Sequence, residues 1–223
     1  MVAKLTSVKK ACKINDAAFR ETVKHFPKFR TEKDVAKFLN HEIRRRGARL
    51  AFRTIVANGP HAYQLHHKPC KKKLGRGFTV IDFGAKVGGW CTDMTRTVFI
   101  GAPTERELEI YSLVENSQKK CAKLSRSGTL CAYIDHKASE FLGKYAPNFI
   151  HAVGHGIDKK VHANPKISPR SADRLKAGEI IAIEPGIYIK KKFGIRIEDT
   201  VLVGKKPNVL TQFTTKLVRV HAK

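Results

Sequence analysis

The chain has 223 residues, with 44 Lys or Arg against 19 Asp or Glu, so its formal net charge at pH 7 is +25. A chain of this length can form a single domain with a sizeable hydrophobic core. No stretch of about eighteen apolar residues occurs, which excludes a transmembrane helix. The N-terminal segment also lacks the apolar core of a signal peptide.

The cysteine pattern indicates a cytoplasmic protein with reduced thiols. The five cysteines are odd in number and form no CxxC pair; they are Cys12, Cys70, Cys91, Cys121 and Cys131. This pattern argues against a disulfide framework and against a zinc site.

Helical and strand-like segments follow one another in an order that occurs twice. Apolar spacing predicts helices over 8–24 and 32–46, and a strand at 51–57 then leads to a β-hairpin. Two more helices are predicted over 104–124, where Thr104 and Glu107 form a capping box, and over 130–145. A strand at 149–153 and a second hairpin follow. The repeated order predicts a pseudo-twofold α+β fold. Because no Pro-, Gly- or Ser-rich linker interrupts the chain, residues 1–223 are predicted to form one domain.

The first hairpin carries two acids inside apolar segments. Asp82 lies in TVIDFGAKVGGW and Asp93 in CTDMTRTVF, on either side of Gly88-Gly89. A loop centred on Val87-Gly88 predicts that Asp82 faces Asp93, with Cβ atoms about 4.5–5.5 Å apart. Two carboxylates this close repel each other unless a cation or a shared proton neutralises them.

The second hairpin repeats this pattern. Glu184 ends an apolar run in EIIAIEPGIYI, Glu198 lies in FGIRIEDTVLV, and the loop between them is centred on Lys191. His155 in HAVGHGID adds an imidazole. Four carboxylates and one His suit a pair of divalent ions bridged by carboxylate oxygens. The alternative is that the acids are solvated, but acids in apolar strands are seldom buried unless they are paired or bind metal.

The segments VIDFGAKVGGWCTDMTRTVFIG, HAVGHGID, IEPGIY and GIRIEDT resemble those of the pita-bread metallopeptidases, in particular the Xaa-Pro dipeptidases (prolidases) and aminopeptidase P. The resemblance implies the pita-bread (creatinase/aminopeptidase) fold, in which helices cover one face of a curved antiparallel sheet. It also implies a dinuclear-metal enzyme that hydrolyses the bond between an N-terminal residue and proline, in Xaa-Pro dipeptides or at Xaa-Pro N-termini. The oxygen-rich ligand set favours Mn²⁺ or Co²⁺ as the two ions.

The resemblance also implies roles for the acids and the histidine. Asp82 would chelate one ion, and His155 and Glu184 would hold the other. Asp93 and Glu198 would bridge both ions. Glu184 would in addition be the general base, as its position in the family suggests.

Three more histidines match family positions around the substrate. His66 in QLHHKP corresponds to a histidine near the scissile amide, and His162 in KKVHANP to one that stabilises the tetrahedral intermediate. His151 matches a histidine of the substrate pocket. His61 and His67 have no such support and are interpreted as ordinary loop residues.

Arg196 matches a family arginine that orients ligands and acids. It lies two residues before Glu198 and is therefore predicted to share its strand face. A bidentate guanidinium suits the orienting role. The alternative, which is compatible with that role, is a salt bridge to Asp199 or Glu198.

The chain departs from the family in two respects. The catalytic part begins almost at Met1, so the N-terminal domain that usually precedes it in these peptidases is expected to be absent. That puts substrate access and dimerisation in doubt, although a homodimer stays among the expectations. Lys159 and Lys160 stand where the family has small or apolar residues. They would shift preference toward acidic peptides or a free C-terminal carboxylate if they face the pocket, and have no such effect if they face solvent.

Two other functions remain as alternatives. Methionine aminopeptidase shares the five ligands but is disfavoured, because Glu198 lies in the Xaa-Pro-peptidase-like GIRIEDT. A basic nucleic-acid or ribosome binder on the same fold would suit the charge of +25. No interleaved aromatic residues or recognition motif support it, so only weak, non-specific nucleic-acid binding is expected beside the peptide substrate, and no membrane contact.

Overall fold

Two α-helices followed by a group of strands occur twice along the computed structural model, which describes residues 2–223. The α-helices are α1 (Val2–His25), α2 (Glu32–Arg45), α3 (Glu105–Leu124) and α4 (Cys131–Leu142), and the short 3₁₀ helices are η1 (Phe26–Lys28), η2 (Gly59–Tyr63) and η3 (Gly143–Asn148). The strands of the first half are β1 (Arg49–Leu50), β2 (Ile55–Asn58), β3 (Gly77–Phe83), β4 (Ala85–Val87), β5 (Trp90–Cys91) and β6 (Met94–Ile100). Those of the second half are β7 (Gly154–Gly156), β8 (Ala163–Ile167), β9 (Ile180–Ile183), β10 (Gly186–Ile189), β11 (Phe193–Arg196), β12 (Asp199–Leu202), β13 (Asn208–Val209) and β14 (Val218–Val220).

The four predicted helices are confirmed, with shifts at their ends. The capping box at the start of α3 is present, since Thr104 and Glu107 exchange hydrogen bonds. A second capping box, between Thr31 and Asp34, starts α2. The fourth helix ends at Leu142, earlier than predicted, because Gly143 adopts a positive φ of 55° and the chain continues as η3.

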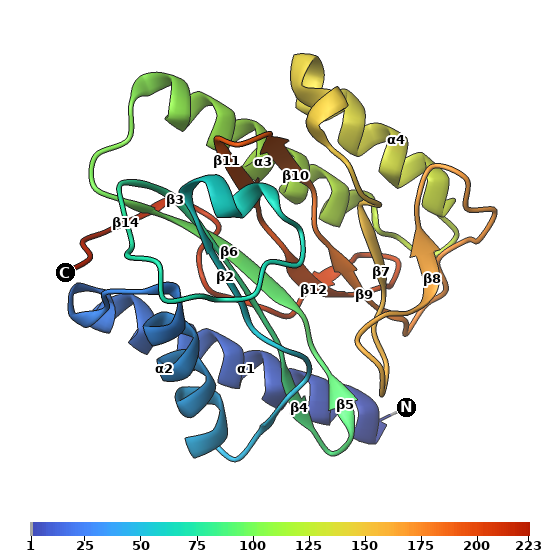
Figure 1. Ribbon diagram of the computed structural model, residues 1–223. Helices are drawn as coiled ribbons and strands as arrows, with labels where there is room; N and C mark the ends of the chain where they lie inside the picture. Colours follow the sequence, from blue (N-terminus) through green and yellow to red (C-terminus); the bar gives the residue numbers. More distant parts are fainter. Residues whose placement is uncertain (1) are drawn as a thin grey trace.

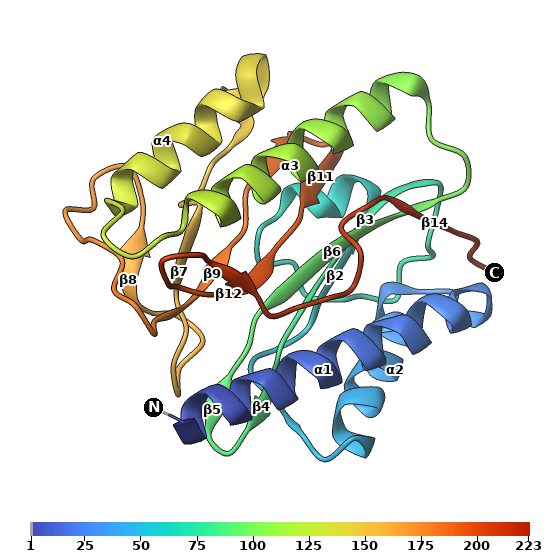
Figure 2. The ribbon, with the colours of Figure 1, turned by 180° about the vertical axis from the view of Figure 1, so that it is seen from behind.

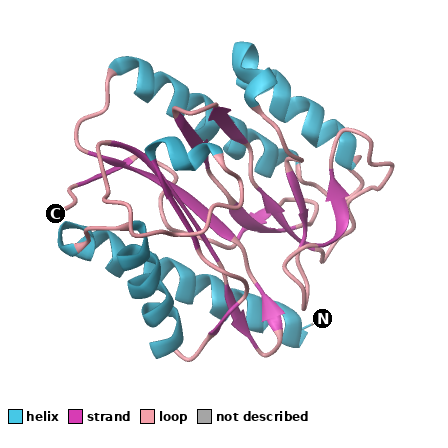
Figure 3. Ribbon diagram, viewed as in Figure 1, coloured by secondary structure: helices cyan, strands magenta, loops and turns pink. Residues whose placement is uncertain are grey.

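Two larger sheets make up the centre of the fold (Figures 1 and 3). One has the strand order β14-β6-β3-β2 and the other the order β13-β12-β9-β7-β8; all pairs are antiparallel except β14 with β6. An antiparallel bridge between Thr95 and Glu198 joins the two sheets. The two acid-bearing hairpins therefore meet, as the predicted pseudo-twofold repeat requires.

The register of the first hairpin differs from the prediction. Asp82 faces Thr95, not Asp93, because the turn is centred on Gly88-Gly89, one residue position beyond the predicted centre. Both glycines have positive φ, 56° and 84°, which is what a two-residue type I′ turn requires. Asp93 lies in the short irregular stretch between β5 and β6.

The second hairpin has the predicted register. Ile189 pairs with Phe193 and Ile183 pairs with Asp199, so the loop is centred on Lys191, which has φ of 58°. The preceding strand was misplaced: residues 149–153 are irregular, and β7 begins at Gly154. A Cβ at Gly154 would lie 2.1 Å from the Ala182 carbonyl oxygen, so the close pairing of β7 with β9 requires glycine there.

Helices cover one side of the sheets. Figure 2 shows α1 and α3 lying across this side, whereas Figure 1 shows η2 and the segment before β8 on the other. Hydrophobic contacts hold α1 and α2 to β3, through Phe19, Leu39 and Ile81, and hold α4 to β9, through Ile134 and Ile181. Among the described helices, none has an apolar stretch of the length needed to cross a membrane.

Candidate metal centre

The four acids and His155 lie around one cavity, on the side of the sheets opposite α1 and α3. Asp82 lies on β3, and His155 lies on β7. Asp93 immediately precedes β6, Glu184 follows β9, and Glu198 precedes β12. The cavity has a volume of about 1110 Å³, and all five residues line it. Asp93, Glu184 and Glu198 lie at short breaks between strands, and these breaks direct their side chains toward the cavity. In a regular strand, successive side chains would point to opposite faces.

The donor atoms of three of these residues are close enough to share a metal ion. Oxygen or nitrogen atoms from Asp93, His155 and Glu198 all lie within 4.8 Å of one another. His155 Nε2 is 3.7 Å from Asp93 Oδ2 and 3.6 Å from Glu184 Oε1. The Oδ1 atoms of Asp82 and Asp93 are buried without a hydrogen-bond partner. Buried carboxylate oxygens seldom lack partners, so these residues fit a bound cation.

The raised pKa values of three carboxyl groups in the site also fit a bound cation. Burial raises the pKa of Asp93 well above its ordinary value, and the nearby Glu198 and Asp82 raise it further. The pKa of Glu198 is raised by burial and by Glu184 and Asp82. Burial raises the pKa of Glu184 to about 7, with Asp82 adding to the rise and Arg196 opposing it. A cluster of carboxylates with raised pKa values favours either protons or cations.

His155 has the protonation state of a metal ligand. Burial, with His162 nearby, lowers its pKa to about 4, so the imidazole is neutral at pH 7. Its Nδ1 is 3.0 Å from the Gly156 carbonyl oxygen, which leaves Nε2 directed at Asp93 and Glu184. A backbone partner on one ring nitrogen is the usual support for a histidine that binds metal through the other.

Arg196 contacts Asp82 and not the two acids named as alternatives. Its Nη2 donates to Asp82 Oδ2 at 2.6 Å, and its Nη1 to the Tyr188 hydroxyl at 3.0 Å. Although burial disfavours the guanidinium charge, Tyr188, Asp82 and Glu184 hold the pKa of Arg196 above its ordinary value. The Tyr188 hydroxyl also lies 2.8 Å from His151 Nε2. Burial and the Arg196 charge lower the pKa of His151 to about 3, so this imidazole is neutral.

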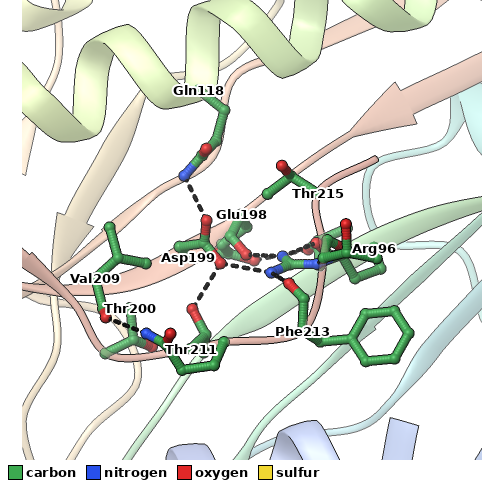
Figure 4. Close-up of polar contacts among 12 residues, drawn as sticks. Arg96, Gln118, Glu198, Asp199, Thr200, Val209, Thr211, Phe213 and Thr215 are labelled. Atoms are coloured by element: carbon green, nitrogen blue, oxygen red, sulfur yellow. Dashed lines mark hydrogen bonds and ion pairs between the residues drawn. The ribbon is translucent and has the colours of Figure 1, made fainter. Parts of the chain in front are cut away.

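Asp199 pairs instead with Arg96, which the sequence analysis did not single out. Figure 4 shows this network: Arg96 Nη2 donates to Asp199 Oδ1 at 2.6 Å, and Arg96 Nη1 donates to the Glu198 carbonyl oxygen at 2.6 Å. Gln118 donates to the other Asp199 oxygen, and Thr211 to Oδ1. The network holds the backbone of Glu198 against β6. Thr95, also overlooked, donates to Glu198 Oε2 at 2.6 Å.

The remaining predicted residues also have defined places. His66, His151 and His162 line the same cavity, and the rings of His155 and His162 are 4.4 Å apart edge to face. Lys159 and Lys160 are exposed and do not line the cavity. The sequence carried little signal for Tyr188, Arg96 and Thr95, because the partners of these side chains come together only in the folded chain.

Comparisons with known proteins show the family of the chain. Residues 6–205 match the family model of metallopeptidase family M24. The chain is 37% identical over 200 residues to a Xaa-Pro dipeptidase of Pyrococcus furiosus and 36% identical over 202 residues to one of Pyrococcus horikoshii. These alignments cover 88% and 89% of this chain and 58% of each relative, so the chain spans just over half their length.

Solved structures give the same answer for the fold. An X-Pro aminopeptidase from Thermotoga maritima superimposes with a TM-score of 0.95 at 36% identity, over 99% of this chain and 64% of that one. A prolidase from Pyrococcus furiosus superimposes with a TM-score of 0.92 at 35% identity, over 95% of this chain and 64% of that one. The fold is the pita-bread fold that the sequence resemblance implied, and the chain belongs to metallopeptidase family M24.

Proposed function

We propose that this protein is a metal-dependent peptidase that hydrolyses the bond between an N-terminal residue and proline. The observation that carries the proposal is the convergence of Asp82, Asp93, His155, Glu184 and Glu198 on one cavity, with two orphaned carboxylate oxygens among them. The relatives named as Xaa-Pro dipeptidases supply the substrate class. We also propose that residues 1–223 form one catalytic domain, because the described part has contacting sheets and no linker.

The five residues would hold two divalent ions, and the oxygen-rich donor set favours Mn²⁺ or Co²⁺. We assign Asp82 to one ion, His155 and Glu184 to the other, and Asp93 and Glu198 to both. When bound, such ions supply Lewis-acid polarisation of a peptide carbonyl and lower the pKa of a water molecule.

Glu184 is the proposed general base. Its carboxylate lies 3.6 Å from His155 Nε2 and 3.9 Å from Arg196 Nε, at the edge of the cavity. Burial raises its pKa to about 7, and nearby cations would bring that value down again. A carboxylate in this position can accept a proton from water and hold it at an Oε atom until the leaving amine takes it.

The remaining cavity residues would bind and orient the peptide. His66 would lie near the scissile amide, and His162 would stabilise the tetrahedral intermediate. His151 presents a neutral imidazole to the pocket, held by Tyr188. Arg196 orients Asp82 through their ion pair. Together, these residues would hold the peptide in one orientation in the cavity.

A small substrate panel tests the function. The panel contains Met-Pro, Leu-Pro, Xaa-Pro-Xaa tripeptides and Met-Ala-Ser, each with added Mn²⁺ or Co²⁺. Cleavage of the proline peptides and not of Met-Ala-Ser supports the proposal. Cleavage of Met-Ala-Ser alone would instead favour a methionine aminopeptidase, and no cleavage of any peptide would contradict the enzyme assignment. Comparing dipeptides with tripeptides decides between dipeptidase and aminopeptidase activity.

A cytoplasmic location is part of the proposal. All five cysteines are free thiols, and four of them are buried in the core. Unpaired cysteines in this number are typical of reducing compartments.

A further inference from the structure

A second cluster of metal-ligating side chains lies apart from the five residues above. It consists of Glu32 at the start of α2, His61 in η2, and His67 and Cys70 in the segment between η2 and β3. One donor atom from each residue lies within 4.8 Å of the donor atoms of the other three. The sequence predicts His61 and His67 to be ordinary loop residues and predicts no zinc site.

Glu32 lies at the centre of this cluster. Its Oε1 is 2.8 Å from His61 Nδ1, and its Oε2 is 2.8 Å from His67 Nε2 and 3.2 Å from Cys70 Sγ. The Glu32 side chain is only 1% exposed, while those of His67 and His61 are 10% and 23% exposed. The carboxylate is thus enclosed, and the two imidazoles leave a short path to solvent.

The carboxylate is held in its ionised form. Although burial disfavours its charge, hydrogen bonds from Asn58, His67 and Cys70 hold the pKa of Glu32 below its ordinary value. Two of these bonds come from the backbone N–H groups of Asn58, at 2.9 Å, and Cys70, at 3.1 Å. Glu32 therefore offers a negative charge next to two nitrogen donors and a thiol.

The backbone around the cluster keeps these donors together. Lys33 N–H donates to the Cys70 carbonyl oxygen at 3.2 Å, and Leu74 N–H donates to the Arg30 carbonyl oxygen at 2.9 Å. Residues 30–33 and 70–74 thus run side by side. Little rearrangement is needed to bring the four donors around one ion, so the ordering cost of binding is small.

We propose that Glu32, His61, His67 and Cys70 bind one zinc ion. A thiolate, two imidazoles and a carboxylate form a tetrahedral donor set of the kind that Zn²⁺ prefers. Zinc–ligand bonds of about 2.0–2.3 Å place neighbouring donors roughly 3.3–3.8 Å apart. The contacts to Glu32, now 2.8–3.2 Å, need to widen by about half an ångström to admit the ion, and donor pairs that now lie up to 4.8 Å apart need to close by up to about 1 Å. For the ion to bind, the Cys70 thiol loses its proton to solvent, and the neutral imidazoles of His61 and His67 each carry their hydrogen on the ring nitrogen that faces away from the ion.

This site differs chemically from the proposed catalytic centre. The catalytic candidates offer carboxylates and one imidazole, with no thiol, whereas the second site includes Cys70. Cys70 is the one cysteine of the five that is not buried. A thiolate–metal signal and the reactivity of an accessible thiol therefore report on the second site alone.

Cobalt spectroscopy on the full chain tests the proposal. Protein freed of metal by a chelator is titrated with Co²⁺, which reports thiolate ligation through a near-ultraviolet charge-transfer band. We expect the band to appear in the wild type and in Asp93→Ala, and to disappear on adding Zn²⁺. Cys70→Ser should lose the band and bind zinc at this site at least about 10-fold more weakly, whereas the matched control Cys131→Ser, which alters a buried thiol, should keep both.

Thiol labelling of the wild type tests the same site without any substitution. Zn²⁺ should slow the reaction of Cys70 with a thiol reagent at least tenfold, as expected at zinc concentrations about ten times the Kd. Absence of the band together with unchanged labelling of Cys70 would overturn the proposal and leave the cluster as a hydrogen-bonded anchor only. Because Asp93→Ala is included, failure of the catalytic assignment and failure of this one are distinguishable.

Discussion

Arg196 and Asp82 form a 2.6 Å ion pair beneath the candidate metal centre, with both side chains largely enclosed in protein. The pair occupies Asp82 Oδ2 and leaves Oδ1 buried without a partner. One oxygen is thus held by the protein and the other is left to face the cavity. Arg196 also reaches Tyr188 and Thr95, so its guanidinium links the candidate ligand to the pocket and to the Glu198 contact.

Arg196→Lys should lower kcat/KM for a proline dipeptide by about 10–100-fold, the usual range for residues that support metal ligands. A single ammonium cannot replace the guanidinium in its contacts with Asp82, Tyr188 and Thr95 at once. Arg219→Lys, a matched change at an exposed arginine, should leave activity unaltered. Equal activity of both variants would contradict the orienting role.

Asp93→Ala should abolish binding of both catalytic ions, because we assign Asp93 as a bridge between them. Metal analysis after equilibrium dialysis against Mn²⁺ measures the loss, and activity should fall with it. The control is Asp173→Ala, at an exposed aspartate that does not line the cavity. Retention of both ions in Asp93→Ala would show that the bridging assignment is wrong.

Glu184→Gln should keep the fold and lose about 10²–10⁴-fold in kcat, the usual contribution of a general base. The amide preserves the shape of the side chain but cannot accept the proton. Steady-state kinetics on Met-Pro, with circular dichroism to check folding, measure the effect. Glu140→Gln is the matched control, since Glu140 is 62% exposed and pairs only with Lys137. A rate near that of the wild type would exclude Glu184 as the base.

As pH rises from about 4.3 toward 7, the metal-free wild type should lose stability relative to metal-free Glu184→Gln, whereas the lowered pKa values of His151 and His155 act in the opposite direction in both proteins. In that range the folded state holds a proton on Glu184, whose pKa is about 7, whereas the unfolded chain has released it at about 4.3. At Glu184 the folded state therefore binds more protons, and the contribution of this residue to the free energy of unfolding decreases with pH. At about 1.4 kcal/mol per pKa unit, the change amounts to a few kcal/mol.

Denaturant unfolding with a chelator at several pH values measures this change. The free energy of unfolding of metal-free wild type minus that of metal-free Glu184→Gln should fall over this range, and Mn²⁺ should largely remove the fall because the ions stabilise the ionised carboxylate of Glu184. A difference between the two proteins that rises over the same range would contradict the raised pKa of Glu184.

The charge of +25 should give only weak, non-specific nucleic-acid binding. Binding of this kind comes from counterion release and should largely disappear between about 50 and 200 mM salt. A gel-shift titration across salt, run beside the hydrolysis assay, measures it. A salt-resistant, sequence-selective complex together with no peptide cleavage would reverse the functional proposal.

Much of the fold was predictable from local patterns. Apolar periodicity identified the four helices, and the capping box at Thr104 and Glu107 located the start of one of them. The loop centre at Lys191 set the correct register for Glu184 and Glu198. These features depend on contacts between residues close together in the chain, so the sequence expresses them directly.

The first hairpin shows where local reasoning fails. A shift of one residue in the turn centre moved the expected partner of Asp82 from Asp93 to Thr95. The choice between neighbouring turn centres depends on the conformations of Gly88 and Gly89, and on how β3 and β6 pack on the helices. A pattern of residue types does not distinguish these registers.

The sequence by itself determined the order of elements and the spacing of the five candidate ligands. Only the tertiary structure decided which groups hold those ligands in place. Arg196 pairs with Asp82 across 114 positions, and Arg96 pairs with Asp199 across 103. Likewise, Glu32 contacts Cys70, which lies 38 positions further along the chain. This contact is part of the proposed zinc site. Such contacts form because folding brings distant segments into a dry interior where buried charges need partners, and no local pattern specifies which partner each one finds.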